Sequence, residues 1–228
     1  MTIASWRRFA YILGILGAFQ FVALTLLAMY VYPGGTMHNP GWENYSFLYN
    51  YFSDLGRTRT FSGADNGLSQ GLFKTALTVG GLCLIVFFAA LPALFRNKVA
   101  KGFILIASVL GLIAGGCYIA IAHLPLNVDY WGHRFYVRTG FIAFLGMLIF
   151  YASAILREPG YPRRYAFAFG LFGIILFIQI VIMFFGPRAW RSEDALFLQA
   201  VAQKVVVYAE ILCMLYQSWG ALKVSMNR

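Results

Sequence analysis

Charged residues are scarce in this chain. Lys, Arg, Asp and Glu make up 11% of its 228 residues, whereas hydrophobic residues make up 61%. A soluble domain typically carries about 25% charged residues, so this chain lacks the polar surface that water requires. A lipid bilayer removes the requirement, because side chains that face hydrocarbon need not be polar. The composition therefore predicts an integral membrane protein and leaves no room for a separate soluble domain.

Cysteine and histidine are also few, with three of each. Cys83, Cys117 and Cys213 each lie inside an apolar run, where cysteine behaves as a small hydrophobe. No CxxC pair indicates a zinc cage or a redox motif. The net charge is +10, but the basic residues form short clusters between apolar runs rather than a stripe interleaved with aromatic residues. We therefore do not expect nucleic acid as a partner.

Long apolar runs are what the chain has in abundance. Spanning a hydrocarbon core about 30 Å thick takes roughly 20 helical residues, and six runs are long enough. They predict transmembrane helices over residues 9–31, 72–95, 102–122, 135–156, 165–186 and 195–222. The first run is too long for a signal-peptide core, so we expect a retained helix. The predicted fold is all-α: a polytopic six-helix membrane bundle in one domain, 1–228, with an ordered outer loop, or cap, over 32–71.

The distribution of basic residues predicts the orientation. With the N-terminus inside, the inner segments hold Arg7, Arg8, Arg96, Lys98, Lys101, Arg157, Arg163, Arg164, Lys223 and Arg228. The outer segments hold Arg57, Arg59, Lys74, Arg134, Arg138, Arg188 and Arg191. Short cytoplasmic loops carry an excess of Lys and Arg, so the larger inner set places both termini in the cytoplasm of a multi-pass cell-membrane protein.

Candidate ligand-binding side chains gather on the predicted outer side. The cap contains the stretch NYSFLYNYFSDLGRTRT, and AHLPLNVDYWGHRFYVRTG joins the third and fourth predicted helices. A loop as long as the cap is often functional. A pocket between the cap and these helix ends would collect hydroxyl, carboxylate, imidazole and guanidinium groups. The candidates there are Ser53, Asp54, Arg57, Arg59, His123, Asp129, His133, Arg134 and Arg138.

These residue types admit more than one interpretation. Arg57 and Arg59 suit a phosphate group, which a guanidinium binds with two parallel donors, but they also suit a solvated loop. Ser53 and Asp54 are candidate ligand contacts and equally good helix caps. Both interpretations stay open at the level of the sequence.

Metal-dependent hydrolysis is an alternative chemistry for the same side. His123, His133, Asp54 and Asp129 offer imidazole and carboxylate ligands that suit zinc, and bound zinc activates water. No ligand spacing such as HExxH supports the site, so we expect no cofactor, with zinc as the alternative. Ser53, His133 and Asp129 also contain the residue types of a hydrolytic triad, again without support from spacing.

Polar residues interrupt the sixth predicted helix. Gln199, Gln203, Glu210 and Gln217 follow spacings that place them near one helix face, with Lys204 beside them. Ionisable groups at membrane depth are costly and usually face the bundle interior or a water-filled cavity. Glu210 is therefore a further candidate ligand-binding residue, lining a cavity continuous with the outer pocket. The alternative is a structural ion pair, with Lys204 as its partner.

Several short motifs have counterparts in a known family. They are YPGG, NYFSDLG, a Gly-rich start of the second helix, and LPLNVDYWGHRFYVRTGFIAF, with Ser53-Asp54-Leu55-Gly56, Pro125, Asp129, His133 and Gly140 as the points of resemblance. On these residues the chain resembles the DUF998 membrane-protein family, which is similar to the wider Frag1/DRAM/Sfk1 group. The resemblance implies a six-helix protein whose relatives are tied to lipid handling, and it assigns no activity.

The expected function follows from the pocket and the membrane together. We expect a protein that binds lipid or another amphiphile in an outward-facing pocket, as a lipid-handling factor or as a subunit of a larger membrane assembly. Membrane lipids are the expected partners, with other membrane subunits as further ones. The alternatives are a metal-dependent membrane hydrolase and a small transporter that works through Glu210 and Lys204. The sequence does not decide whether the protein is an enzyme.

Overall fold

The computed structural model describes residues 3–227 and shows an all-α protein. The six long helices are α1 (Ile3–Tyr30), α2 (Gly67–Ala90), α3 (Lys98–His123), α4 (Tyr130–Arg157), α5 (Arg164–Phe185) and α6 (Glu193–Met226). Three short 3-10 helices accompany them, namely η1 (Phe52–Gly56), η2 (Leu91–Leu94) and η3 (Ala189–Arg191). All six long helices are long and apolar enough to cross a membrane, which confirms a multi-pass integral membrane protein.

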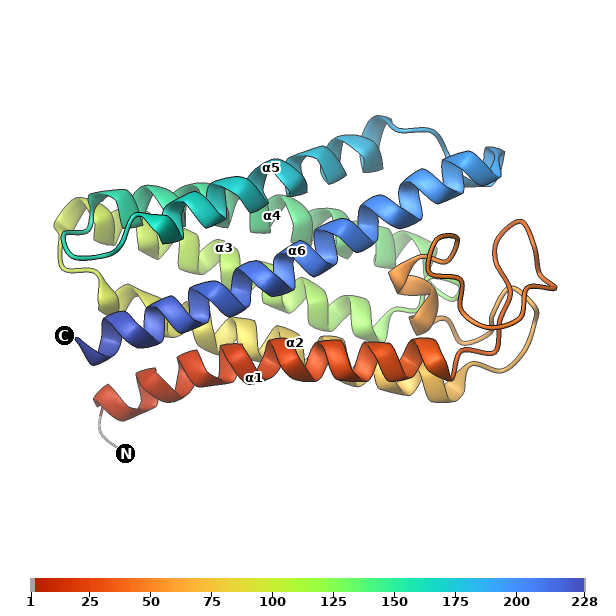
Figure 1. The fold of residues 1–228 in the computed structure, drawn as a ribbon, viewed down its shortest axis with the longest axis horizontal. Coiled ribbons are helices and arrows are strands. Elements are labelled where there is room, and N and C mark those ends of the chain that lie inside the picture. The colour runs from red at the N-terminus through yellow and green to blue at the C-terminus, as the bar shows by residue number, and fades with distance from the viewer. Residues whose placement is uncertain (1–2, 228) are drawn as a thin grey trace.

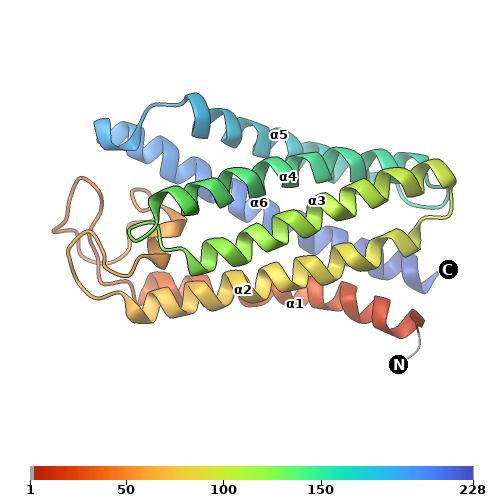
Figure 2. The same ribbon diagram turned by 180° about the vertical axis from the view of Figure 1, so that it is seen from behind.

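The six helices form a closed ring. Each long helix packs against the next one in the chain, and α6 closes the ring by packing against α1 as well as α5. Figure 1 shows α1, α5 and α6 in front, and Figure 2 shows α2, α3 and α4 side by side behind them. Both chain ends lie at one end of the bundle, and the loop between α1 and α2 lies at the other. We call these the terminal end and the cap end.

The helices run further than the hydropathy of the sequence predicts. The basic residues Arg7 and Arg8 lie within α1 instead of preceding it, and α2 begins at Gly67 instead of Leu72. Hydropathy marks only the stretch that suits hydrocarbon, whereas backbone hydrogen bonding continues into the polar region at each side. As a result, the cap covers residues 31–66, and residues 67–71 belong to α2.

The terminal half of the ring interior is filled with aromatic side chains. Phe87, Phe88, Phe144, Tyr151 and Phe169 are fully buried in one hydrophobic cluster. Several of their rings meet edge to face, for example Phe87 with Phe88 at 5.3 Å between centroids. Edge-to-face pairs add stability beyond the area they bury. This tightly packed half holds the helices in place around the half nearer the cap, where cavities lie between them.

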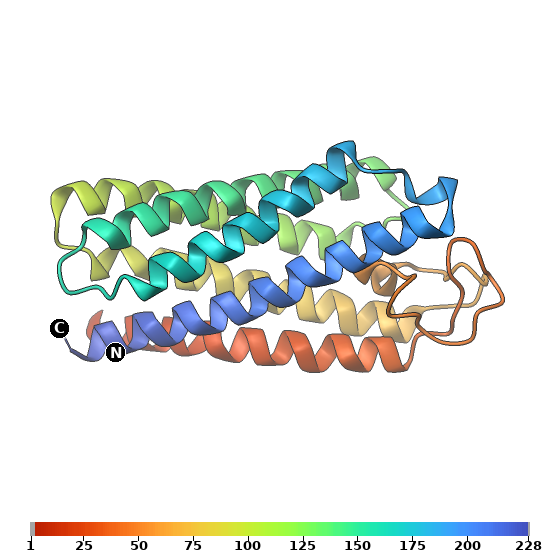
Figure 3. The ribbon, with the colours of Figure 1, turned by 45° about the horizontal axis from the view of Figure 1, so that its top comes forward.

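The cap is held by its own polar contacts and by the helix ends. Gly34 and Gly35 adopt positive φ angles of 107° and 89°, which glycine tolerates and side-chain-bearing residues rarely do. Asn66 donates from Nδ2 to the carbonyl oxygens of Leu55 and Arg57 at 3.1 and 2.8 Å. Figure 3 shows the cap beyond the end of α1 and beside the first turns of α6. The cap thus closes one end of the ring.

The orientation of the bundle is open to a direct test. We expect a compartment-sensitive reporter at residue 45 of the cap to report the outside, and reporters at both termini to report the cytoplasm. The reason is the excess of Lys and Arg in the short segments of the terminal end. A cytoplasmic signal from position 45 would contradict this prediction and place the cap on the inner side.

Candidate ligand-binding site

An apolar cavity lies inside the ring at its cap-end half. It has a volume of about 130 Å³ and is lined by α1, α2, α3, α4 and α6. Aromatic side chains form much of its wall, and Phe52 and Ser53 of η1 border it from the cap. Gly14, Gly17 and Gly80 also border it, and a Cβ atom at Gly14 or Gly17 would meet Ser218 or Cys83, so these two glycines let neighbouring helices pack closely beside the cavity. An engineered protein cavity of about 150 Å³ with apolar walls binds benzene, so this volume accommodates a ring or a short segment of chain.

A second cavity, of about 270 Å³, adjoins the first between α4, α5, α6 and the cap. We call it the arginine cavity, because Arg134, Arg138 and Arg188 line it and no carboxylate does. Arg134 and Arg138 come from α4, and Arg188 comes from the connection between α5 and α6. The short α5–α6 connection places a cation opposite the two cations of α4, although they are about 50 positions apart in the chain.

Among residues 3–227, no carboxylate lies within 4 Å of any of these three guanidinium groups. The carbon at the centre of each group lies about 5 Å above an aromatic ring, that of Tyr130, Phe184 or Trp190. Arg134 also donates to the hydroxyl of Tyr130, whereas Nε of Arg138 has no hydrogen-bond partner. Within residues 3–227, the one side-chain ion pair within 4 Å joins Arg57 to Asp54. The arginine cavity therefore carries a concentrated positive charge.

Five residues line both cavities, so the two lie directly against each other, and we call them together the joined cavities and each of them a lobe. The five residues are Ser53, His133, Val137, Phe141 and Gln203. Together the two volumes, about 130 and about 270 Å³, fall within the range of roughly 300–1,000 Å³ that small-molecule sites occupy. One lobe is apolar and the other is cationic, which is the arrangement an anionic amphiphile requires.

His133 has a fixed orientation at the junction. Its Nδ1 lies 2.7 Å from the carbonyl oxygen of Leu124. A carbonyl oxygen only accepts, so Nδ1 carries the proton and Nε2 is the acceptor in the neutral ring. Ser53 is also at the junction, and its side chain is buried. The two residues can orient a bound group through one donor and one acceptor.

Glu210 lines the apolar lobe from α6. Its two carboxylate oxygens each lie 2.8 Å from the hydroxyl of Tyr118 on α3. The carboxyl group is buried, at 9% relative exposure. Its predicted partner Lys204 lies elsewhere: Lys204 donates to the carbonyl oxygen of Asn50 in the cap. The Glu210–Lys204 ion pair is therefore not formed, because the two residues are six positions apart on the helix and so lie on different faces.

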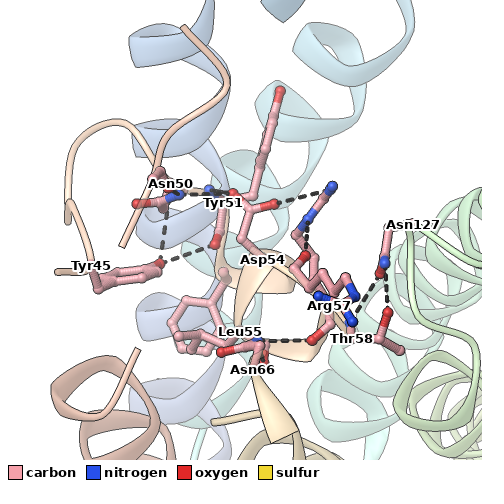
Figure 4. Close-up of polar contacts among 12 residues, drawn as sticks. Tyr45, Asn50, Tyr51, Asp54, Leu55, Arg57, Thr58, Asn66 and Asn127 are labelled. Carbon is pink, nitrogen blue, oxygen red and sulfur yellow. Dashed lines mark hydrogen bonds and ion pairs between the residues drawn. The ribbon is translucent and has the colours of Figure 1, made fainter. Parts of the chain in front are cut away.

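Asp54 belongs to a polar network inside the cap, shown in Figure 4. Its Oδ2 accepts from the backbone N–H of Tyr51 at 2.8 Å and from Nδ2 of Asn50 at 3.3 Å. Burial raises the pKa of the Asp54 carboxyl, and the nearby charge of Arg57 opposes that rise. Asp54 thus shapes the cap rather than lining either cavity.

The remaining candidate residues form hydrogen bonds within the protein and lie outside the two cavities. Arg57 and Arg59 donate to carbonyl oxygens of the cap, at 3.2 and 3.1 Å, and neither lines a cavity. His123 is exposed, with Nε2 3.3 Å from Oγ1 of Thr78. Asp129 caps α4 by accepting from the N–H of Gly132 at 2.9 Å. Of the predicted residues, the structure brings Ser53, His133, Arg134, Arg138 and Glu210 to the joined cavities.

The alternative metal ligands are not brought together. Among the described residues, 3–227, there is no group of three or more His, Cys, Asp or Glu side chains arranged to hold a metal ion. His123, His133, Asp54 and Asp129 instead have the separate hydrogen bonds given above. Zinc stays an alternative prediction from the sequence.

Three polar or charged residues that line the joined cavities, Arg188, Tyr118 and Gln179, are absent from the sequence-based set of candidates. Arg188 had a weak signal, since it is a basic residue in a short connection on the predicted outer side. Nothing in the sequence marks Tyr118, because an aromatic residue in a transmembrane helix usually serves only to pack against its neighbours. Gln179 on α5 also lines the arginine cavity, and its Oε1 is buried without a partner. A buried amide without a partner is costly unless a ligand or water satisfies it.

The chain matches no protein-family model, no curated protein and no solved structure. The residues that carry the resemblance to the DUF998 family are nevertheless placed by the fold. Ser53-Asp54-Leu55-Gly56 forms most of η1, and His133 lies at the junction of the two cavities. Membership of that family stays a prediction from the sequence.

Proposed function

We propose that this membrane protein binds an anionic amphiphile in the two joined cavities at its cap end. The anionic group, a phosphate or a carboxylate, occupies the arginine cavity, and the adjoining apolar part extends into the apolar lobe. The observation that carries the proposal is the set of five residues common to both cavities, which places a cationic cavity directly beside an apolar one.

Uncompensated positive charge supports the anionic half of the ligand. Arg138 lies eight residues beyond Tyr130, the first residue of α4, which corresponds to about 12 Å along the helix axis. A cation at that depth needs a counter-ion or water, and ionisable residues inside membranes usually mark functional sites. Guanidinium groups bind phosphate and carboxylate with forked donors, so such a group is the natural counter-ion for Arg134, Arg138 and Arg188.

The hydrolase alternative has less support from the described contacts. Asp129 is used as the cap of α4, and His133 is oriented by a backbone carbonyl rather than by a carboxylate. The Ser53, His133 and Asp129 triad is thus not assembled in this arrangement. A lipid-handling factor and a subunit of a larger membrane assembly both agree with the proposed binding site.

Removing one cation should weaken the bound anion. In the Arg138→Gln variant, we expect the population of copurifying anionic lipid to fall about tenfold, because a hydrogen bond to a charged group contributes about 1.5–3 kcal/mol. Native mass spectrometry of detergent-purified protein, with equal amounts of phosphatidylglycerol, palmitate and phosphatidylcholine, measures the adducts. A phospholipid and a fatty acid are distinguished by adduct mass.

The matched control is Lys74→Gln, which removes an exposed cation of α2 that lines neither cavity. It should leave the adducts unchanged. If Arg138→Gln and Arg188→Gln, singly and together, retain the anionic adducts of the parent protein, the proposed function is wrong. An equal loss of phosphatidylcholine and of the anionic lipids would also count against the proposed function, because the arginines would then not distinguish anionic from zwitterionic lipids.

A further inference from the structure

We infer that the apolar lobe is a binding site for an organic amine with an apolar body, with the Glu210 carboxylate as its counter-ion. This site goes beyond the anionic site of the arginine cavity and does not depend on it. The inference comes from an acidic side chain whose surroundings provide room and apolar contact but no cation.

The carboxyl group of Glu210 is incompletely satisfied by the protein. Among residues 3–227, its hydrogen-bond partner is the Tyr118 hydroxyl, which has one proton and therefore donates to one carboxylate oxygen at a time. The other oxygen is left for a second donor. Among residues 3–227, no Lys, Arg or His nitrogen lies within 4 Å of the Glu210 carboxylate. Lys204, the cation of the same helix, is bonded to the cap.

The wall around the carboxylate suits an ammonium ion with an apolar body. Phe21, Phe52, Phe73, Tyr118 and Phe141 line the same lobe. A cation that is removed from water is stabilised by the face of an aromatic ring, and the apolar body of the ligand is stabilised by burial. An amine supplies both the positive charge and the N–H donor that the free carboxylate oxygen lacks.

A hard metal cation fits this lobe poorly. Magnesium and calcium require about six or more oxygen ligands, whereas the side-chain oxygens on this lobe are those of Glu210, Tyr118, Ser53 and Gln203, and Oε1 of Gln203 already accepts from the backbone N–H of Phe52. A carboxylate surrounded by aromatic rings is instead an environment that recognises organic ammonium groups. The volume of about 130 Å³ limits the buried part of the ligand to about the size of one aromatic ring.

The amine site and the anionic site share a boundary at Phe141 and Val137. An amine in the apolar lobe would therefore occupy space that the apolar part of the anionic amphiphile also uses. We expect the two kinds of ligand to compete when the amphiphile has a long chain.

The test compares a charged probe with a neutral one. N,N-dimethylbenzylamine is cationic at neutral pH, and benzyl methyl ether is a neutral molecule of similar shape. In isothermal titration of the detergent-purified full chain, we expect the amine to bind at least tenfold more tightly than the ether. Glu210→Gln should abolish that difference, and Arg138→Gln should preserve it. A persistent difference in Glu210→Gln, or equal binding of both probes by the parent protein, would overturn the inference.

A second measurement uses the parent protein alone, so it does not depend on the folding of a variant. Dicyclohexylcarbodiimide enters apolar cavities and modifies carboxyl groups there, and peptide mass spectrometry locates the modification. We expect modification of Glu210 to slow at least fivefold in the presence of N,N-dimethylbenzylamine and to be unaffected by benzyl methyl ether. Equal protection by the two probes would mean that the lobe binds any small apolar molecule, and the inference would be wrong. The proposed anionic site is tested by a different measurement, the loss of anionic lipid from Arg138→Gln, so the two proposals can fail independently.

Discussion

Gly115→Ala should lower the free energy of unfolding by about 3 kcal/mol, although it adds only one methyl group. The reason is the contact between α2 and α3. A Cβ atom at position 115 would lie 2.8 Å from Cγ1 of Ile85 and 2.9 Å from the carbonyl oxygen of Gly81. A backbone oxygen cannot rotate away as a side chain can, so the two helices must move apart. Close packing through small residues is a major source of helix association in membranes.

The next residue provides a matched control for this prediction. A Cβ atom at Gly116 would have no heavy atom within 4 Å, so Gly116→Ala should be neutral or stabilising by up to about 1 kcal/mol through helix propensity. Denaturant or thermal unfolding in one detergent would measure both variants. If the two alanine variants have the same stability, the close approach of α2 and α3 is not what holds this pair of helices together.

Lys204→Met should release the cap from α6 and lower the free energy of unfolding by about 2–3 kcal/mol. Lys204 is 2% exposed and donates to the carbonyl oxygen of Asn50. Its Nζ also lies 5.4 and 5.2 Å from the ring centroids of Tyr45 and Phe47. Methionine keeps the length of the side chain but removes the donor and the charge. Trypsin cleavage after Arg59 in the cap should become faster, and the exposed Lys74→Met should leave that rate unchanged.

The effect of Lys204→Met should also depend on pH. Burial raises the pKa of the Asp54 carboxyl, so its stability contribution is fully present below the ordinary aspartate pKa of about 4 and is lost as the pH rises through the raised value. The positive charge of Lys204 favours ionised Asp54 and limits that loss. The stability difference between Lys204→Met and the parent protein should therefore grow as the pH rises towards neutrality. In an Asp54→Asn background, the stability difference caused by Lys204→Met should no longer increase with pH. A difference that is independent of pH in the presence of Asp54 would contradict this prediction.

The number and order of the helices could be predicted because hydropathy reports directly on which side chains suit hydrocarbon. All six predicted spans correspond to long helices. Their ends could not be predicted as well, since a helix stops where its backbone hydrogen bonds stop. Residues 67–71 show the difference: the span predicted from hydropathy begins at Leu72, whereas the hydrogen-bonded α2 begins at Gly67.

The composition of the candidate site was harder to predict, because it depends on which neighbours each side chain meets. Arg57 and Arg134 have the same chemistry in the sequence, but Arg57 lies against Phe61 within the cap and Arg134 lines the arginine cavity. His123 and His133 are ten positions apart at opposite ends of one short connection, and only His133 turns inward. Arg188 lines the arginine cavity because α5 and α6 pack beside α4, and no short sequence pattern predicts that packing.

The attachment of the cap to the last helix has a consequence for biosynthesis. Asn50 and Phe52 are bonded to Lys204 and Gln203, which follow them in the chain by 154 and 151 positions. At about 5–20 residues per second, roughly 8–30 s of translation separate the making of the cap from the arrival of its partners. The cap must therefore wait for the ribosome to make α6 before these contacts can form. A nascent chain stalled before that point should therefore carry a cap that proteases cleave more readily than in the finished protein.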